Sequence, residues 1–162
     1  DDMSTGPEIA ATLEELGFTH VVWIPDSVIG EWEDSLERSD SLELIRVARE
    51  GEAWPLAAGL HIGGKLPIVV MQTTGLFESG DAMRNALFDL GLPLYAIVGH
   101  RGYLVPNSAD TARKYAEPIL RAWGIDYILL DHRGVADSLR DHCLKCRSAN
   151  IPGIALMAEG KG

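Results

Sequence analysis

Apolar residues along this chain recur at two different spacings, and the alternation between them predicts helices separated by strands. Near the N-terminus the spacing is helical, between a cap at Ser4 or Thr5 and a stop at Gly17. The segment 19–24 is then rich in β-branched and aromatic residues, which is typical of a strand. The same switch repeats along the rest of the chain.

This pattern predicts six strands and the helices that connect them. We expect the strands at 19–24, 42–47, 66–71, 92–98, 126–130 and 152–157. We expect the helices from 4 or 5 to 17, at 28–36, at 50–62, from Ser79 or Asp81 to 90, at 109–123 with Ser108 as cap, and at 134–148. The third strand is apolar almost throughout, which indicates burial on both of its faces.

Strands that alternate with helices favour a parallel sheet covered on both sides. The expected fold is therefore a three-layer α/β/α domain with a central, mostly parallel six-stranded sheet. We expect a single domain over 1–162, with its core at about 5–157.

Composition and charge narrow the function. The chain has 162 residues and a net charge of −10, which argues against binding the phosphates of nucleic acids. No apolar run reaches the roughly 18 residues of a membrane helix, and the first residues lack the features of a signal peptide. We therefore expect a cytoplasmic protein.

Nucleotide and hydrolase motifs are absent from the sequence, and the polar loops after the strands are the better candidates for a site. There is no P-loop, no G-x-G-x-x-G after the first strand and no G-x-S-x-G elbow. In parallel sheets ligands bind at the carboxyl ends of the strands. The polar, glycine-rich loops at those ends are Pro25-Asp26-Ser27, Arg49-Glu50, Gln72-Thr73-Thr74-Gly75 and Gly99-His100-Arg101-Gly102.

Glu50 is the most informative of these residues, because it stands at the head of an otherwise apolar helix rich in small residues. Burial of a carboxylate is costly and favours its protonated form, whereas a helix N-terminus favours the anion. Two other readings stay open: Glu50 is a solvated first-turn residue, or Glu52 is the functional acid instead.

The Glu50 segment also carries a family resemblance. Arg49-Glu50-Gly51-Glu52-Ala53, followed by Gly59 and Gly64-Lys65, resembles the pyrimidine-binding (PYR) domain of thiamine diphosphate-dependent enzymes. Pro25-Asp26-Ser27, Met71 to Leu76 and Gly99 to Gly102 extend the resemblance. The whole set is similar to the alpha subunit of sulfopyruvate decarboxylase and the matching part of phosphonopyruvate decarboxylase.

The resemblance implies a role for each group of residues. Glu50 would be the catalytic acid that activates thiamine diphosphate, with cofactor contacts from Glu50, Pro25, Gln72, Thr73, Thr74 and Gly75. The substrate, an anionic 3-substituted pyruvate, would meet Asp26, Ser27, Gln72, His100 and Arg101. The chain lacks the Gly-Asp-Gly and later Asn that hold magnesium and diphosphate in such enzymes. No metal ligand is therefore expected here, and Mg²⁺ would be held by a separate diphosphate-binding subunit.

The resemblance also implies self-association of PYR domains within a hetero-oligomer. The small residues from Ala53 to Gly59 are a candidate contact face. Two alternatives to a decarboxylase remain: a two-subunit carboligase, and a non-catalytic domain that kept the fold.

Each loop also has a structural interpretation. Asp26 or Ser27 could simply cap a helix, the 72–75 loop could be an ordinary helix entry, and His100 with Arg101 could form a surface loop paired with acids. Cys143 and Cys146, with His142 and His132 nearby, have metal-like spacing. They lie in a predicted surface helix without a second pair, so we interpret them as structural.

Overall fold

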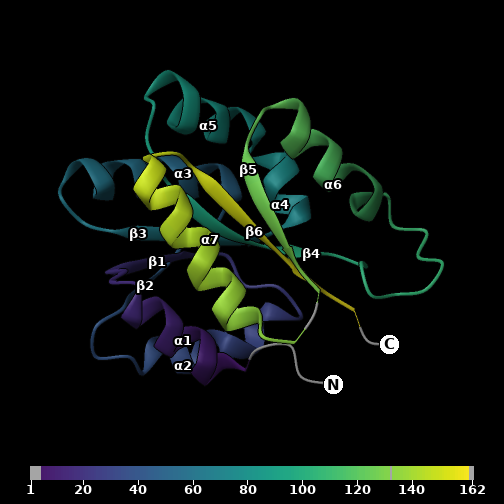
Figure 1. Ribbon diagram of the computed structural model, residues 1–162, viewed down its shortest axis with the longest axis horizontal. Coiled ribbons are helices and arrows are strands. Elements are labelled where there is room, and N and C mark those ends of the chain that lie inside the picture. The colour runs from purple at the N-terminus through teal and green to yellow at the C-terminus, as the bar shows by residue number, and fades with distance from the viewer. Residues whose placement is uncertain (1–4, 132, 161–162) are drawn as a thin grey trace.

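The computed structural model describes residues 5–131 and 133–160, and these residues form three layers around one sheet (Figure 1). All six strands are parallel, in the order β2-β1-β3-β4-β6-β5. Their bounds are β1 His20–Trp23, β2 Glu43–Arg46, β3 Pro67–Gln72, β4 Tyr95–His100, β5 Asp126–Leu130 and β6 Gly153–Ala158. The predicted α/β/α fold is confirmed, and the sheet is wholly rather than mostly parallel.

The described residues also form seven α-helices and two short helices of other types, of which α1 precedes the first strand and the others connect the strands. They are α1 Gly6–Glu15, the 3₁₀ helix η1 Ile29–Trp32, α2 Glu33–Glu37, α3 Glu50–Ile62, α4 Thr73–Glu78, α5 Gly80–Arg84, the π-helix η2 Asn85–Asp89, α6 Thr111–Ala122 and α7 Val135–Ala149. None of them is long and apolar enough to cross a membrane.

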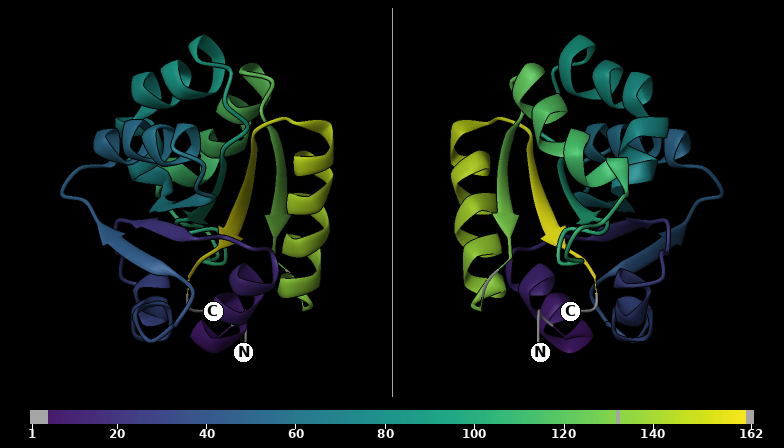
Figure 2. Two further views of the ribbon diagram at one scale, coloured as in Figure 1. Left: turned by 90° about the vertical axis from the view of Figure 1, so that its left-hand side faces the viewer. Right: turned by 90° about the vertical axis from the view of Figure 1, so that its right-hand side faces the viewer.

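The order of the strands explains which helix covers which face. Parallel strands are joined by right-handed crossovers, so connections that step in opposite directions along the sheet lie on opposite faces. The steps from β1 to β2 and from β5 to β6 run one way, and α2 and α7 pack on one face together with α1. The other steps place α3, α4, α5 and α6 on the opposite face (Figure 2).

Each face of the sheet has its own apolar core. The core under α1, α2 and α7 includes Trp23, Ile68 and Ile97, and the core under α3 to α6 includes Met71, Val98 and Leu156. Side chains of adjacent strand residues point to opposite faces. The middle strands β3, β4 and β6 are therefore apolar at nearly every position, as predicted for β3.

Helix α3 begins at Glu50 and ends at Ile62, as predicted, but its small residues do not form an outer contact face. Ala53, Ala57 and Ala58 are all buried in the core against the chain's own sheet. Small side chains here let α3 lie close to its own strands. The proposed contact face from Ala53 to Gly59 is therefore wrong for these three alanines, while Gly59 is exposed.

Four local predictions need correction. Residues 73–75 are not a loop but the first turn of α4, because Gln72 ends β3 in an extended conformation and the chain turns directly into a helix. The predicted 28–36 helix divides into η1 and α2. Asp110 caps α6 instead of Ser108, accepting from the Ala112 amide at 3.0 Å. The helix predicted from Ser79 or Asp81 to 90 is α5 followed by a π-helical turn.

The structure also tests the predicted cap of the first helix and the predicted position of the two cysteines. Thr5 caps α1 together with Glu8 in a reciprocal capping box, while Ser4 lies outside the described residues. Cys143 and Cys146 are buried, so the prediction of a surface position is wrong. They lie on the side of α7 that packs against the sheet. His132 lies outside the described residues.

Candidate functional site

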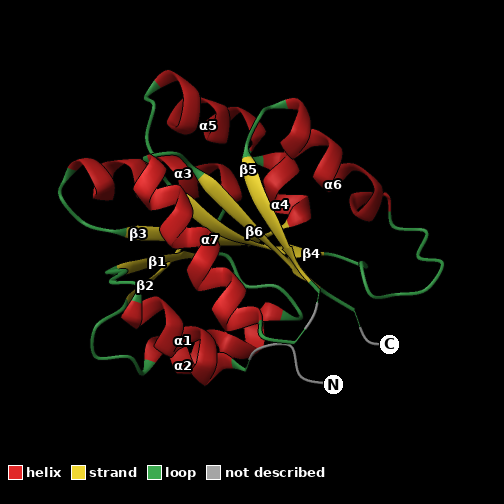
Figure 3. Cartoon of the chain, viewed as in Figure 1, coloured by secondary structure: helices red, strands yellow, loops and turns green. Residues whose placement is uncertain are grey.

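The loops with the predicted site residues all leave the same edge of the sheet, because every strand is parallel. Figure 3 shows this edge, where β4 runs into the long loop that precedes α6. The register places Gln72 of β3 beside Gly99 of β4, and Gly99 beside Met157 of β6. Side chains from β1, β3, β4 and β6 can therefore meet above Gly99.

Glu50 is held against the first turn of α4. A Cβ on Gly75 would overlap Glu50 Cγ and would lie 2.8 Å from Glu50 Oε1, so the carboxyl group lies directly over a backbone that has no side chain. Glu50 is half-buried, and its carboxylate has no hydrogen bond or ion pair with any residue in the described ranges. A free carboxylate at a helix N-terminus is available to a ligand.

Glu52, the alternative candidate for the functional acid, already accepts a hydrogen bond within the chain. Its Oε2 accepts from the backbone amide of Ala48 at 3.2 Å, on the exposed side of the first turn. Glu52 therefore holds the start of α3, whereas Glu50 does not take part in holding the helix.

Polar contacts next to Glu50 join the start of α3 to the end of α4. Arg49 Nη2 donates to Glu78 Oε1 at 2.7 Å, and Glu78 Oε2 accepts from the Gly51 amide at 3.1 Å. The Arg49 guanidinium is the main reason that the pKa of Glu78 lies below its ordinary value. Beneath them Trp54 Nε1 donates to Ser79 Oγ at 3.0 Å, in a buried contact. The position of Glu50 therefore rests on a rigid helix pair.

A second group of side chains lines a cavity of about 370 Å³ at the same edge. Its walls come from the segment after β1, the end of β3, the segment after β4 and the end of β6. The lining residues are Asp26, Ser27, Val28, Gln72, Arg101, Gly102, Glu159 and Gly160. Four predicted residues, Asp26, Ser27, Gln72 and Arg101, therefore meet here. Another cavity of about 160 Å³, mainly apolar, lies at the amino end of the sheet near Phe18, Tyr95 and Cys146.

Glu159 is the residue that the sequence reading missed. It follows β6 and is only 1% exposed, and its Oε2 accepts from Gln72 Nε2 at 3.2 Å. Burial first, and the neighbouring Asp26 carboxyl second, raise the pKa of Glu159 to about 8. The signal was present in the sequence: Glu159 directly follows β6, and Asp26 and Glu50 likewise lie within a few residues after β1 and β2, but Glu159 is close to the end of the chain.

Asp26 has two roles in the structure. Its Oδ1 accepts from the amides of Val28 at 2.6 Å and Ile29 at 2.8 Å, which is the capping role that the sequence left open. Its Oδ2 is buried, accepts from no donor among the described groups, and points toward Glu159 above Gly99. Asp26 is therefore both a turn residue and a wall of the cavity.

His100 and Arg101 lie apart from each other. Arg101 borders the cavity and pairs through Nε with Asp110 Oδ2 at 2.6 Å. His100 is fully buried, and its ring lies 4.9 Å from the Tyr103 ring. Burial lowers the pKa of His100, and neither ring nitrogen has a hydrogen-bond partner within the described part of the chain. His100 does not line the cavity with Arg101.

The remaining predicted residues surround these two groups. Thr73 is fully buried, and its hydroxyl has no partner among the residues that the structure describes. Thr74 Oγ1 donates to Gln72 Oε1 at 3.1 Å, which orients the Gln72 amide toward Glu159. Pro25 is exposed at the rim. Gly75 is the residue that makes room for Glu50.

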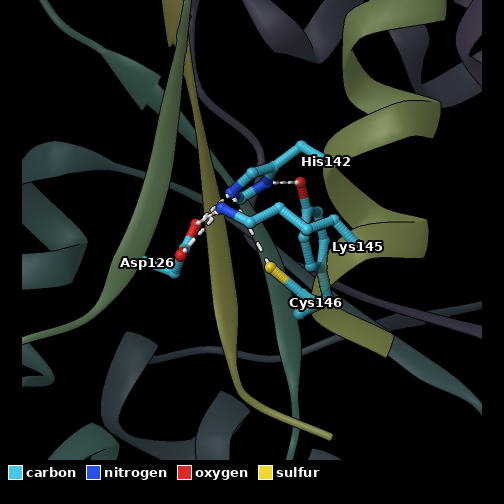
Figure 4. A network of polar contacts seen from close by, with 5 residues as sticks. Asp126, His142, Lys145 and Cys146 are labelled. Atoms are coloured by element: carbon cyan, nitrogen blue, oxygen red, sulfur yellow. Dashed lines mark hydrogen bonds and ion pairs between the residues drawn. The ribbon is translucent and has the colours of Figure 1, made fainter. Parts of the chain in front are cut away.

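The cysteine helix contributes to a separate network at the amino end of the sheet (Figure 4). His142 Nε2 contacts Asp126 Oδ1 at 2.7 Å, and His142 Nδ1 contacts the Tyr95 hydroxyl at 2.7 Å. Lys145 Nζ lies 3.1 Å from Asp126 Oδ2, and Cys146 Sγ lies 3.7 Å from His142 Nε2. One ligand atom from each of Asp126, His142 and Cys146 lies within 4.8 Å of the others. These atoms already satisfy one another, and burial raises the pKa of Cys146 to about 11, so we interpret the network as structural.

The chain corresponds to a known class of proteins. Residues 3–117 match the family described as "Thiamine pyrophosphate enzyme, N-terminal TPP binding domain". The match covers well over half of the chain, and the chain belongs to this family. Membership implies thiamine diphosphate as the cofactor of the enzyme of which this domain is a part.

The curated relatives narrow the class further. The sulfopyruvate decarboxylase subunit alpha of Methanothermobacter thermautotrophicus is 27% identical over 94 residues, covering 58% of this chain and 57% of the relative. The phosphonopyruvate decarboxylase of Streptomyces viridochromogenes is 28% identical over 95 residues, covering 59% of this chain and 24% of the relative. The chain therefore spans about half of the first relative and about a quarter of the second. This domain is distantly related to these decarboxylases.

Proposed function

We propose that this chain is the pyrimidine-binding, alpha-type subunit of a thiamine diphosphate-dependent decarboxylase in the cytoplasm. Its substrate would be an anionic 3-substituted pyruvate such as sulfopyruvate or phosphonopyruvate. A separate subunit would hold the diphosphate and Mg²⁺. The relatives described as subunit alpha support a partner of this kind.

The observation that carries the proposal is the position of Glu50. Its carboxylate is half-buried, unpaired within the described residues and packed on the bare backbone of Gly75. A flat aminopyrimidine ring needs such a site: a carboxylate for a ring nitrogen, and space that no Cβ fills. The residues present therefore fit the cofactor's ring.

Each residue of this edge has a distinct task in the proposed reaction. Bound thiamine diphosphate supplies the electron sink for the carbon–carbon bond that breaks. Glu50 would hold the proton that it shares with a ring nitrogen of the cofactor, and its place in a protein interface would exclude competing water. Gln72 and Ser27 would orient the 2-oxo acid in the cavity of about 370 Å³.

Arg101 supports an anionic substrate. Its side chain is about half exposed, so the guanidinium can bind a sulfonate or phosphonate beside its present partner Asp110. Asp26 and Asp110 are also close, which limits the strength of anion binding. We therefore expect Arg101 to select among 2-oxo acids rather than to provide most of the binding energy.

The test is Glu50→Gln in the protein assembled with its diphosphate-binding subunit, with Glu52→Gln as the matched control. Glutamine keeps the size of the side chain but holds no exchangeable carboxyl proton, so we expect turnover to fall by about 10²- to 10⁴-fold. The control should keep near-normal turnover. Carbon dioxide release from sulfopyruvate, phosphonopyruvate and pyruvate would be measured, together with calorimetric binding of thiamine diphosphate. A Glu50→Gln protein with normal turnover would remove Glu50 from the activating role.

A further inference from the structure

We propose that Asp26 and Glu159 share one proton across the top of Gly99, and that this pair donates the proton which replaces the departing carbon dioxide in the product. This inference rests on the proposed function. It adds Glu159 as a catalytic residue and gives Asp26 a task beyond capping.

Two carboxyl oxygens, one from Asp26 and one from Glu159, converge above Gly99. Glu159 Oε1 and Asp26 Oδ2 are both buried, and neither accepts a hydrogen bond from a donor in the described ranges. A Cβ on Gly99 would overlap Glu159 Oε1 and would lie 3.0 Å from Asp26 Oδ2, so the two oxygens converge on one point. A buried acceptor without a donor is costly. A single proton between the two carboxyl groups would satisfy both atoms.

Polar and charged groups from three other segments surround Glu159. Asp26 approaches from the segment after β1, Gln72 donates from the end of β3, and Arg101 lies after β4 with Asp110 as its partner. Backbone bonds fix the residue itself: the Glu159 amide donates to the His100 carbonyl at 3.2 Å, and the Glu159 carbonyl accepts from the Leu104 amide at 2.9 Å.

The balance of these surroundings favours a neutral carboxylic acid. Burial and Asp26 both raise the pKa of Glu159, whereas the Gln72 amide and the Arg101 charge only partly oppose them. A buried carboxyl group that keeps its proton at neutral pH is the arrangement that supplies a general acid.

The carboxyl pair lies beside the proposed substrate cavity. Both residues line the cavity that we assign to the substrate, on the same edge of the sheet as Glu50. The cavity is open to solvent water, so the pair can regain its proton after each turnover. By contrast, His100 does not line this cavity, and its ring packs against Tyr103.

The chemistry requires one proton per turnover. A 2-oxo acid anion loses carbon dioxide when the bond between its carboxylate and carbonyl carbons breaks, and the electron pair of that bond stays on the carbonyl carbon. A new C–H bond forms there with the proton from Glu159, which gives the aldehyde and leaves the pair with one additional negative charge. A proton from water restores the pair, so the total is 2-oxo acid anion plus H⁺ giving aldehyde plus carbon dioxide.

The first experiment separates carbon–carbon cleavage from protonation in the assembled protein. Glu159→Gln cannot donate a carboxyl proton, so we expect steady-state aldehyde formation to fall by about 10²-fold or more. Carbon dioxide release in the first turnover should continue at one equivalent per site. The control is Glu43→Gln, which changes an exposed acid at the amino end of β2, away from the cavity. This variant should behave as the wild type. Equal loss of first-turnover carbon dioxide and of aldehyde in Glu159→Gln would overturn the proposal.

The second experiment uses the pH profile. Wild-type turnover should fall as the pH rises through about 8, where the pair loses its proton. Asp26→Asn keeps an oxygen for the turn at Val28 and removes the neighbouring charge, so the fall should move to lower pH. Glu159→Gln should lose this fall altogether. An unchanged profile in both variants would assign the proton to another group.

The third measurement does not depend on activity. Infrared spectroscopy of the assembled protein without substrate should show the carbonyl band of a protonated carboxylic acid at pH 7, and Glu159→Gln should remove it. If no 2-oxo acid releases carbon dioxide, the proposed function and the donor role both fail, while this band still decides whether the pair shares a proton. If carbon dioxide is released but the band is absent, only the present inference fails.

Discussion

The two ends of this sheet carry polar clusters that differ in how completely their polar atoms are paired. At the amino end, Asp126, His142, Tyr95 and Lys145 form a closed network in which each polar group has a partner within 3.3 Å. At the carboxyl end, Asp26, Glu159 and Thr73 each bury an oxygen that has no partner among the described residues, and the Glu50 carboxylate is free.

This difference distinguishes a structural network at the amino end from a candidate ligand-binding site at the carboxyl end. Buried polar groups are normally satisfied, so a closed network is expected wherever a fold needs polar atoms inside. A concentration of unsatisfied groups at one edge is retained against its cost in stability, and a ligand is the simplest reason. The spacing of Cys143 and Cys146 therefore misleads, whereas the plain acids after β1, β2 and β6 are informative.

Among the substitutions that test this difference between the two ends, the largest effect should come from Gly75→Ala. The added methyl group would occupy the position of the Glu50 carboxyl and push it away from the cofactor. We expect turnover to fall by about 10²-fold or more. The change in the free energy of unfolding should be smaller than the change in activation free energy that corresponds to this fall. Gly30→Ala, where the added Cβ meets nothing within 4 Å, is the control for cofactor binding and turnover measurements. Normal turnover in Gly75→Ala would show that the contact between Glu50 and Gly75 has no functional role.

At the amino end, a substitution should lower stability and leave turnover unchanged. His142→Ala would leave the Tyr95 hydroxyl and one Asp126 oxygen without their partner and would open a cavity. We expect a loss of about 2–4 kcal/mol in the free energy of unfolding, measured by urea denaturation, with kcat unchanged below the melting temperature. Lost turnover in a fully folded variant would mean that this network also takes part in the chemistry.

The carboxyl pair should make stability depend on pH. Glu159 keeps its proton in the folded state up to a pKa of about 8, while in the unfolded chain it ionises near 4.5. Between these values the unfolded state binds fewer protons, so the contribution of Glu159 to stability is fully present below pH 4.5 and is lost as the pH rises to about 8.

Glu159→Gln removes this dependence. The stability of the wild type should fall relative to that of the variant by about 1 kcal/mol per pH unit between pH 5 and 8. Urea unfolding at a series of pH values measures the difference, with Asp40→Asn, which changes an exposed acid, as control. A difference that stays constant with pH would mean that Glu159 is ionised in the folded protein.

The smallest effect should come from Arg101→Ala. Arg101 is half exposed and shared with Asp110, so its loss should raise KM for sulfopyruvate or phosphonopyruvate by about 3- to 10-fold. KM for pyruvate should change less. Steady-state kinetics with the three acids provide the comparison, and an equal change for all of them would remove Arg101 from recognition of the anionic group.

The sequence by itself determined the succession of strands and helices along the chain, the parallel α/β/α class and the bounds of α3, and it singled out Glu50 as the candidate acid. These features are local: apolar spacing, caps and the identity of a few residues specify them. The tertiary structure alone decided that Asp26 and Glu159 face each other, that His100 and Arg101 separate, and that the alanines of α3 face inward. These outcomes depend on strand order, register and burial, which join residues far apart in the chain and which no local pattern encodes.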